Sequence, residues 1–291
     1  MDHHIIVGLD AFPESAAAAR WAAREARLRD AALHLIHAEP WSLPLGIPAA
    51  ASDARRGWAE AVLQDMADEL RRAHPGLDIT AQSVDGPPAA SLATAATTAD
   101  MLVMGSRGLG SVTGFVLGSV GMTVIHTTER PVVLVRSGED ALPHETEQHS
   151  RRHVVVGVDI GRPCDALLAF AFEEASRRSC PLHALHSWPP PQFYGYGSAY
   201  DPGMLAHINQ SVTTGLDQAL SPWRDAFPTV EVTARTPMGH AAQQLLDAGA
   251  DAGLIVVGRR IRRSLLGVRI GSTTHAVIHH ATAPVAVVAH D

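Results

Sequence analysis

A glycine-rich segment spanning residues 101–120 carries the clearest chemistry in this chain of 291 residues. An apolar stretch ends at its first glycine, and its last glycine precedes Ser119 at the expected start of a helix. Glycine lets a backbone approach a ligand closely, and the free N–H groups of a helix N-terminus attract an anion. The segment therefore predicts a phosphate-binding loop, against the alternative of a tight structural turn. Its glycines are Gly105, Gly108, Gly110, Gly114 and Gly118.

The basic residues of the chain restrict how a phosphate would be held. All 23 are arginines, because the sequence contains no lysine. A GxxxxGK[ST] phosphate loop and a Schiff-base lysine are therefore excluded. Backbone amides, hydroxyl groups and an arginine such as Arg107 remain as phosphate ligands. No nucleophile elbow or paired-carboxylate motif accompanies the loop, so we expect a protein that is not an enzyme, with slow ATP hydrolysis left open.

The elements that position this loop occur twice. Residues 6–10 return as residues 155–159, a shift of 149, whereas Gly105 and Gly118 return as Gly258 and Gly271, a shift of 153. A net insertion of four residues therefore falls between, in the stretch rich in proline and glycine at 189–202. A polar segment separates the copies. The expected domains are residues 1–137 and 152–291, joined by a linker over 138–151.

Each copy alternates apolar strands with helical stretches. Such alternation predicts an α/β fold with two tandem, doubly wound, mostly parallel five-stranded sheets of the Rossmann-like kind. Ligands bind such sheets beyond the carboxyl ends of the strands, where the glycine loop falls. In the first helix, Trp21 and Leu28 are seven residues apart and are expected on one face. The strands expected in the first copy are 5–9, 33–38, 78–84, 101–104 and 131–135, and the helices are 13–30, 53–73, 89–97 and 119–127.

The spacing of the loop, G-x2-G-x9-G-[S/T], resembles the nucleotide motif of ATP-binding universal stress proteins. The first copy matches every fixed position of that motif. The resemblance extends to Asp10 after the first strand, His37 at the end of the second and Gly86 before the third helix. It covers the chain apart from the linker and the loops at 42–51 and 189–202. The fold it implies is that of the adenine nucleotide alpha hydrolase-like group.

The resemblance also implies which residues contact the ligand. Asp10 and the backbone near Gly8 and Ala38 would contact adenine or ribose, although an aspartate after a strand can simply cap the next helix. The glycine loop and the following helix would hold the phosphates of ATP, with or without Mg²⁺. The loop residues implied are Gly105, Ser106, Arg107, Gly108, Leu109, Gly110, Ser111, Gly118, Ser119 and Val120.

The second copy departs from this motif. Ile261 replaces the second motif glycine, and its β-branched side chain resists positive φ and would crowd a phosphate. Four arginines surround it within five residues and would either bind phosphate in place of the loop amides or form a solvated basic loop. We expect this site to be altered or lost. Its candidate residues are Gly157, Asp159, Gly258, Arg259, Arg260, Gly271, Ser272 and Thr273.

The charge and composition of the chain argue against several classes of binding partner. The net charge of −7 argues against a nucleic-acid binder. No apolar run is long enough to span a membrane, and the N-terminus does not have the order of a signal peptide. Cys164 and Cys180 match no metal spacing or disulfide framework, and the 17 histidines form no metal motif, since His34 and His37 should point to opposite faces of a strand. We therefore expect a cytoplasmic protein without a bound metal.

These observations favour a cytoplasmic, ATP-binding regulator of the stress-response type that reports energy state to a protein partner. Two alternatives stay open: an interaction module that no longer depends on nucleotide, and a weak ATP hydrolase. In related proteins the last strands of two domains pair. The resemblance therefore implies an intrachain pseudo-dimer here through strands 131–136 and 284–290, with a homodimer as a further option.

Overall fold

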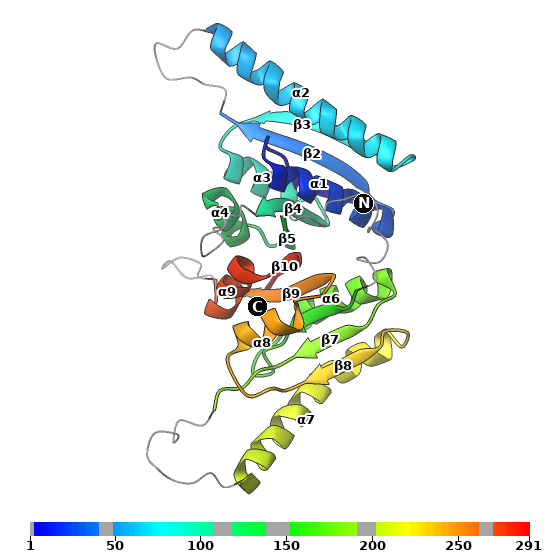
Figure 1. The fold of residues 1–291 in the computed structure, drawn as a ribbon, viewed down its shortest axis with the longest axis vertical. Helices are drawn as coiled ribbons and strands as arrows, with labels where there is room; N and C mark the ends of the chain where they lie inside the picture. Colours follow the sequence, from blue (N-terminus) through cyan, green and yellow to red (C-terminus); the bar gives the residue numbers. More distant parts are fainter. Residues whose placement is uncertain (1–2, 41–48, 107–117, 138–151, 191–201, 262–269) are drawn as a thin grey trace. The chain divides into compact units, whose positions relative to one another are not determined.

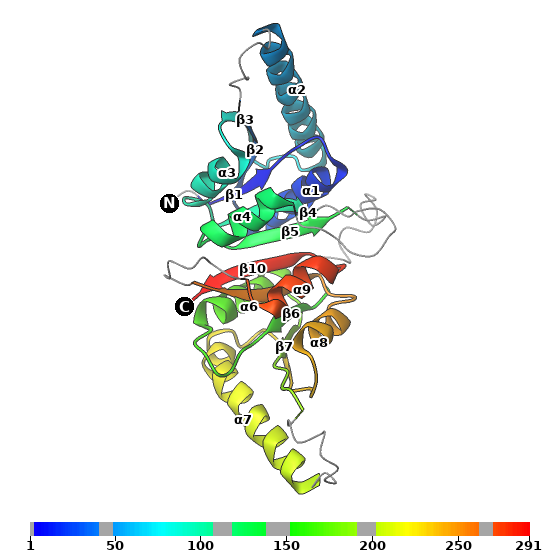
Figure 2. The ribbon, with the colours of Figure 1, turned by 90° about the vertical axis from the view of Figure 1, so that its left-hand side faces the viewer.

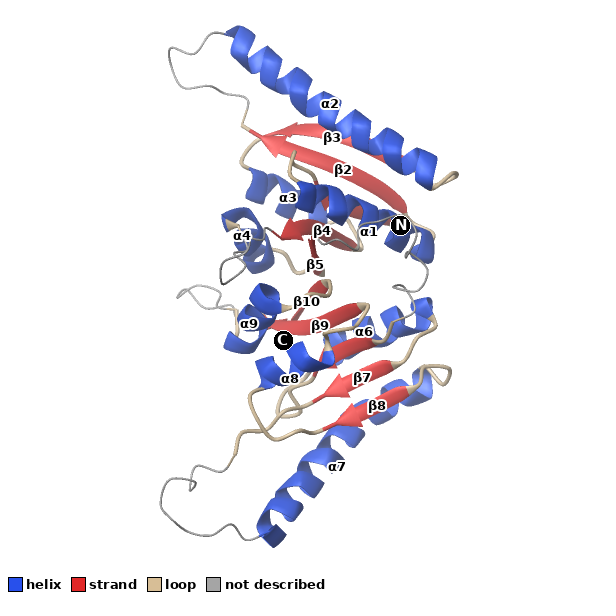
Figure 3. Ribbon diagram, viewed as in Figure 1, coloured by secondary structure: helices blue, strands red, loops and turns tan. Residues whose placement is uncertain are grey.

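The structure is a computed structural model that describes residues 3–40, 49–106, 118–137, 152–190, 202–261 and 270–291. The chain divides into two compact units, Met1–His144 and Glu145–Asp291. Each unit alternates strands with helices (Figures 1 and 3). In this way the described residues confirm the tandem α/β architecture that the repeat predicts.

The first unit contains five parallel strands in the order β3-β2-β1-β4-β5. Helices α1 and α2 cover one face of the sheet, and α3 and α4 cover the other (Figure 2). The strands are β1 (His4–Gly8), β2 (Ala32–Glu39), β3 (Ile79–Asp85), β4 (Met101–Ser106) and β5 (Val132–Arg136). The helices are α1 (Pro13–Arg29), α2 (Ala49–Ala73), α3 (Pro88–Ala96) and α4 (Ser119–Thr127).

The second unit repeats this topology, with the order β8-β7-β6-β9-β10. Helices α2 and α7 have the same length, 25 residues, and are offset by 153, whereas the equivalent residues His37 and His186 before them are offset by 149. The insertion therefore lies between β7 and α7. The strands are β6 (Val154–Gly157), β7 (Leu182–Leu185), β8 (Val232–Arg235), β9 (Leu254–Arg260) and β10 (Val285–His290). The helices are α6 (Asp165–Arg178), α7 (Pro202–Ala226), α8 (Ala241–Ala248) and α9 (Ser272–His280).

The central strands form the cores because helices cover both of their faces. Met101, Leu102 and Val103 of β4 are completely buried, which explains why this strand is continuously apolar rather than alternating. The edge strand β3 is only partly buried along its length. Parallel strands also bring their carboxyl ends to one edge of each sheet, and the residues implied in binding follow those ends.

Helix α1 packs on the sheet mainly through alanine. Pro13 begins it at a position where proline is favoured, and Asp30 ends it in the left-handed conformation with φ of 51°. Leu28 is 39% exposed while Trp21 is buried, so the prediction of one shared apolar face is wrong at its last turn. Small side chains let the helix lie close to the strands. The buried alanines are Ala17, Ala18, Ala19, Ala22, Ala23 and Ala26.

None of the helices in the described ranges combines the length and the apolar character that a membrane span requires.

Candidate functional site

Asp10 lies just beyond the carboxyl end of β1, in a turn that the first residues of α1 hold in place. The backbone N–H of Phe12 donates to Asp10 Oδ1 at 3.1 Å. The Ser15 hydroxyl donates to the Asp10 carbonyl oxygen at 2.6 Å and accepts from the Asp10 N–H at 3.1 Å. The N-cap of α1 is Phe12, so Asp10 closes the turn before the helix rather than capping it. The half-buried carboxylate is thereby fixed at the edge of the sheet.

The end of β2 is tied to the end of β1 through His37. Its Nδ1 lies 2.9 Å from the carbonyl oxygen of Leu9. A carbonyl only accepts, so Nδ1 carries the proton in this bond. His186 makes the same bond to the Val158 carbonyl in the second unit, at 2.8 Å. Ala38 follows His37 and is half-buried, so the sequence-assigned residues of β1 and β2 lie side by side.

Two of the glycines assigned to the site lie against helices, and the packing requires a glycine at Gly105. A Cβ on Gly105 would lie 2.5 Å from the carbonyl carbon of Glu14 in α1, a distance that real side chains do not adopt. A Cβ on Gly8 would lie 3.0 Å from the side chain of Leu92 in α3. Helices on both faces thus approach the ends of β1 and β4. The first motif glycine therefore has a structural reason that is independent of any ligand.

Gly118 differs from these glycines. It is the N-cap of α4 with φ of −61°, which any residue adopts, and no described atom lies within 4 Å of the position its Cβ would take. Ser119 is exposed and Val120 is half-buried. The N-cap residue of α4 makes no side-chain cap hydrogen bond. Among the described residues, packing and φ do not require a glycine here, although glycine is one of the residues favoured at an N-cap.

Ser106, the next residue after Gly105, is buried at the end of β4, and its hydroxyl lies 3.4 Å from the Val135 carbonyl oxygen. The remaining predicted loop residues lie outside the described ranges. They are Arg107, Gly108, Leu109, Gly110 and Ser111.

The second unit fills the corresponding edge with its own side chains. Thr274, which stands where the first unit has Gly121, donates its hydroxyl to the Gly258 carbonyl oxygen at 2.7 Å. The imidazole of His290 lies against Gly258, where a Cβ would be 2.5 Å from its Nε2 atom. Ile261 donates its N–H to the His290 carbonyl at 2.7 Å and so continues the strand ladder. The substituted motif position is thus part of the sheet edge.

The other residues assigned to the second unit are also placed. A Cβ on Gly157 would lie 2.9 Å from Leu245, as Gly8 packs in the first unit. Asp159 is exposed and closes its turn by accepting from the Gly161 N–H at 3.2 Å. Arg260 is exposed. The start of α9 resembles that of α4: Gly271 has φ of −60° and an open Cβ position, Ser272 is exposed and Thr273 is half-buried.

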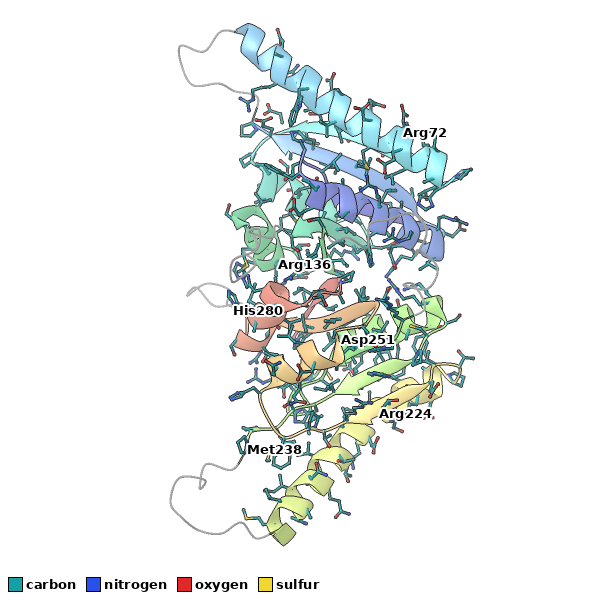
Figure 4. All side chains as sticks on the ribbon, in the orientation of Figure 1. Arg72, Arg136, Arg224, Met238, Asp251 and His280 are labelled. Carbon is teal, nitrogen blue, oxygen red and sulfur yellow. The ribbon has the colours of Figure 1, made fainter. Side chains whose placement is uncertain are left out.

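An arginine occupies different strands of the two units at this edge, and it is half-buried in the first unit and buried in the second. Ser106 of β4 is the register partner of Arg136 at the end of β5 (Figure 4). At the corresponding positions, Arg259 of β9 is the partner of Ala289 of β10. Arg259 is 4% exposed, and burial lowers the pKa of Arg136 to about 10. Each sheet therefore carries one guanidinium beside one small residue, on opposite strands of the pair.

His34 and His37, which the sequence places on one strand, each make a contact with another part of the first unit. His34 stacks on His4 with ring centroids 4.7 Å apart, whereas His37 bonds to Leu9. Burial, followed by the neighbouring His4, lowers the pKa of His34. Within the part of the chain that the structure describes, no group of three or more histidine, cysteine or acidic side chains is arranged to hold a metal ion.

Sequence reasoning missed Ser15, the residue that holds the Asp10 turn. Comparison of the two copies could have identified Ser15, because the equivalent residue of the second unit is Cys164. A thiol forms much weaker hydrogen bonds than a hydroxyl. Burial, then Asp165, raises the pKa of the Cys164 thiol. The hydroxyl at position 15 therefore accompanies the copy whose glycine motif is unaltered.

Replacing Ser15 by alanine is expected to lower the free energy of unfolding by about 1 to 2 kcal/mol, because it removes a buried hydroxyl that bonds both the N–H and the carbonyl of Asp10. Urea denaturation measures this change. Ser15→Cys is the matched control, since it installs the residue of the second unit at similar volume and should cost less. Equal stability of Ser15→Ala and the wild type would contradict the positioning role.

Comparison with known proteins places this α/β chain in a class. The model of the universal stress protein family matches residues 1–136 and 150–289. A universal stress protein of Mycolicibacterium smegmatis is 33% identical over 302 residues, covering 99% of this chain and 97% of that protein. The universal stress protein Rv2005c of Mycobacterium tuberculosis is 30% identical over 293 residues, covering 98% and 96%. The chain belongs to the universal stress protein family, with two such domains in tandem.

A solved structure supports the same fold for the whole chain. A universal stress protein from Archaeoglobus fulgidus matches with a TM-score of 0.73 over 99% of this chain and 98% of that one. The two sequences are 19% identical, so this comparison concerns the fold alone.

Proposed function

We propose that the first unit binds an adenine nucleotide, with ATP as the expected ligand, and that the protein is a cytoplasmic regulator that reports energy state to a protein partner. The observation that carries this proposal is Gly118. This glycine stands at a helix N-cap, and no described atom lies within 4 Å of its Cβ position, so it leaves room for a phosphate. Gly271 of the second unit shares this geometry, and the unaltered motif spacing from Gly105 to Ser119 is what distinguishes the first unit.

The adenosine end of the ligand would lie along β1 and β2. The Asp10 carboxylate is held in a fixed turn, and the His37 bond sets the adjacent backbone of Leu9 and Ala38. A preorganised carboxylate suits a ribose hydroxyl, because it accepts two hydrogen bonds without a further loss of side-chain freedom. If Mg²⁺ accompanies ATP, it would be coordinated mainly by the phosphate oxygens.

The second unit has a different role in this proposal. Thr274 and His290 place larger side chains against Gly258 than Gly121 and Ser137 provide at the corresponding positions of the first unit, and we expect the second unit to bind ATP weakly or not at all. This favours a second candidate function for that half alone, an interaction module that does not depend on nucleotide. Dimerisation through the last strands, which the family resemblance implies, stays a separate prediction.

Calorimetric titration of the nucleotide-free full chain with ATP tests the proposal. One site per chain is the expected result. Two sites would show that the second unit also binds, and no heat of binding would leave the interaction module as the function of both units. Phosphate release is measured in parallel: turnover well above the uncatalysed rate would contradict a binding protein and favour the weak hydrolase.

A further inference from the structure

Trp58 of α2 lies close to the end of the first sheet where the sequence assigns adenine. Its indole ring meets His37 edge-on, with centroids 6.2 Å apart and an angle of 84° between the planes. His37 in turn bonds to Leu9, the residue before Asp10. Only one side chain therefore separates the indole from the backbone at the ends of β1 and β2. In Figure 1 the first turns of α2 lie on the same side as the arrowhead of β2.

The indole is not used to pack the helix. Trp58 is 51% exposed, whereas Ala59, Leu63 and Leu70 of the same helix are buried. A single exposed apolar side chain is common on protein surfaces, so exposure alone does not assign a function to Trp58. What distinguishes Trp58 is that its exposed indole lies beside His37 at the end of β2, where it is available to a ligand.

Charged side chains hold this part of α2 against the sheet edge. Arg55 forms an ion pair with Glu39 at the end of β2. Glu39 also lies 3.6 Å from Nε2 of His37. Because Arg55 is one helical turn before Trp58, the ion pair lies on the same face of α2 as the indole. This face of the helix is thus the one directed at the end of β2.

The second unit lacks the whole arrangement. With the offset of 153 that relates α2 to α7, Ser211 stands in the place of Trp58 and Ile208 in the place of Arg55. Trp188 stands in the place of Glu39, is buried, and donates its Nε1–H to the Thr236 carbonyl at 2.9 Å. The fold of a unit therefore forms without the exposed indole. The cluster accompanies only the copy whose glycine motif is unaltered.

We propose that Trp58 is the stacking wall for the base of the nucleotide bound by the first unit, so that the site selects purine nucleotides over ribose phosphates. This inference rests on the proposed function of that site. Stacking of a base on an aromatic side chain contributes substantially to affinity and requires no hydrogen-bond readout, because every purine presents a flat π face. The Arg55–Glu39 pair acts as a positioning element for that wall.

The test compares a ligand that has a base with one that lacks it. AMP and ribose 5-phosphate are titrated calorimetrically into the full-length wild type, Trp58→Ala and Trp58→Phe. We expect Trp58→Ala to weaken AMP roughly tenfold and to leave ribose 5-phosphate unchanged, while Trp58→Phe retains most of the AMP affinity. Met204→Ala, which truncates an equally exposed apolar side chain of α7, is the matched control and should change neither affinity.

Each other outcome overturns the inference in a recognisable way. If AMP binds the wild type and Trp58→Ala equally, the indole is not in the site, and nucleotide binding by the first unit still stands. If Trp58→Ala weakens AMP and ribose 5-phosphate by the same factor, the residue supports the structure and does not contact the base. If the wild type binds neither AMP nor ATP, the proposed function and this inference fail together.

Discussion

Gly118→Val is expected to abolish detectable ATP binding while the first unit stays folded. The valine Cβ meets no described atom, and φ of −61° suits any residue, so the cost to stability should be about 1 kcal/mol or less, from the poorer N-cap. The added methyl groups would occupy the space beside the first N–H groups of α4. Loss of two hydrogen bonds to a charged phosphate corresponds to a fall in affinity of roughly a hundredfold or more.

The chain offers a matched control for this variant at Gly271. This residue is the N-cap of α9, has φ of −60° and also has an open Cβ position. Gly271→Val should leave the affinity and stoichiometry of ATP unchanged, because the second unit is not expected to supply the site. Unchanged affinity in Gly118→Val would contradict the assignment of phosphate to α4. Loss of one of two sites in each variant would assign nucleotide to both units.

Gly105→Ala should have the largest effect on stability. The new Cβ would lie 2.5 Å from the Glu14 carbonyl carbon and 2.6 Å from the Ser15 nitrogen. Both contacts are with backbone, so α1 would have to move away from β4, at a cost of about 3 kcal/mol. Because Ser15 holds the Asp10 turn, the same movement should also weaken nucleotide binding.

Urea denaturation of Gly105→Ala and Gly118→Ala compares the two motif glycines. Gly105 is explained by close packing against α1, whereas Gly118 is explained by the space it leaves for a ligand. The second variant makes the same substitution at the open position and should stay within about 0.5 kcal/mol of the wild type. If both variants were equally stable, the close approach of α1 to β4 would not be the reason for Gly105. If the free energy of unfolding of both variants fell by about 3 kcal/mol, the conclusion that the Cβ position of Gly118 is open would be wrong.

Much of the fold could be predicted from the sequence, because buried parallel strands are continuous apolar runs and the repeat supplied a second copy for every element. The bounds of helices were less accurate: α2 begins at Ala49, directly after Pro48, rather than at residue 53. The apolar face of α1 was misplaced at Leu28, because alanine rather than bulky side chains makes most of its contact.

The candidate site was predicted only where local spacing encodes it. The position of Gly118 at a helix start follows from short-range pattern. The packing of Gly105 on α1, the contact of His290 with Gly258 and the bond from Thr274 to the Gly258 carbonyl join residues far apart in sequence, and no periodicity reveals them. Ser15 was hidden for another reason: a single hydroxyl in an alanine-rich helix carries no motif.

The exchange of arginine between neighbouring strands limits how one copy could have diverged from the other after duplication. Two substitutions separate the Ser106–Arg136 pair from the Arg259–Ala289 pair. An intermediate that carried both arginines would place two guanidinium groups on adjacent strands, where they repel each other. An intermediate that carried neither arginine would need only small side chains at this edge. The route through the second intermediate avoids the repulsion and is therefore the less costly way from one arrangement to the other.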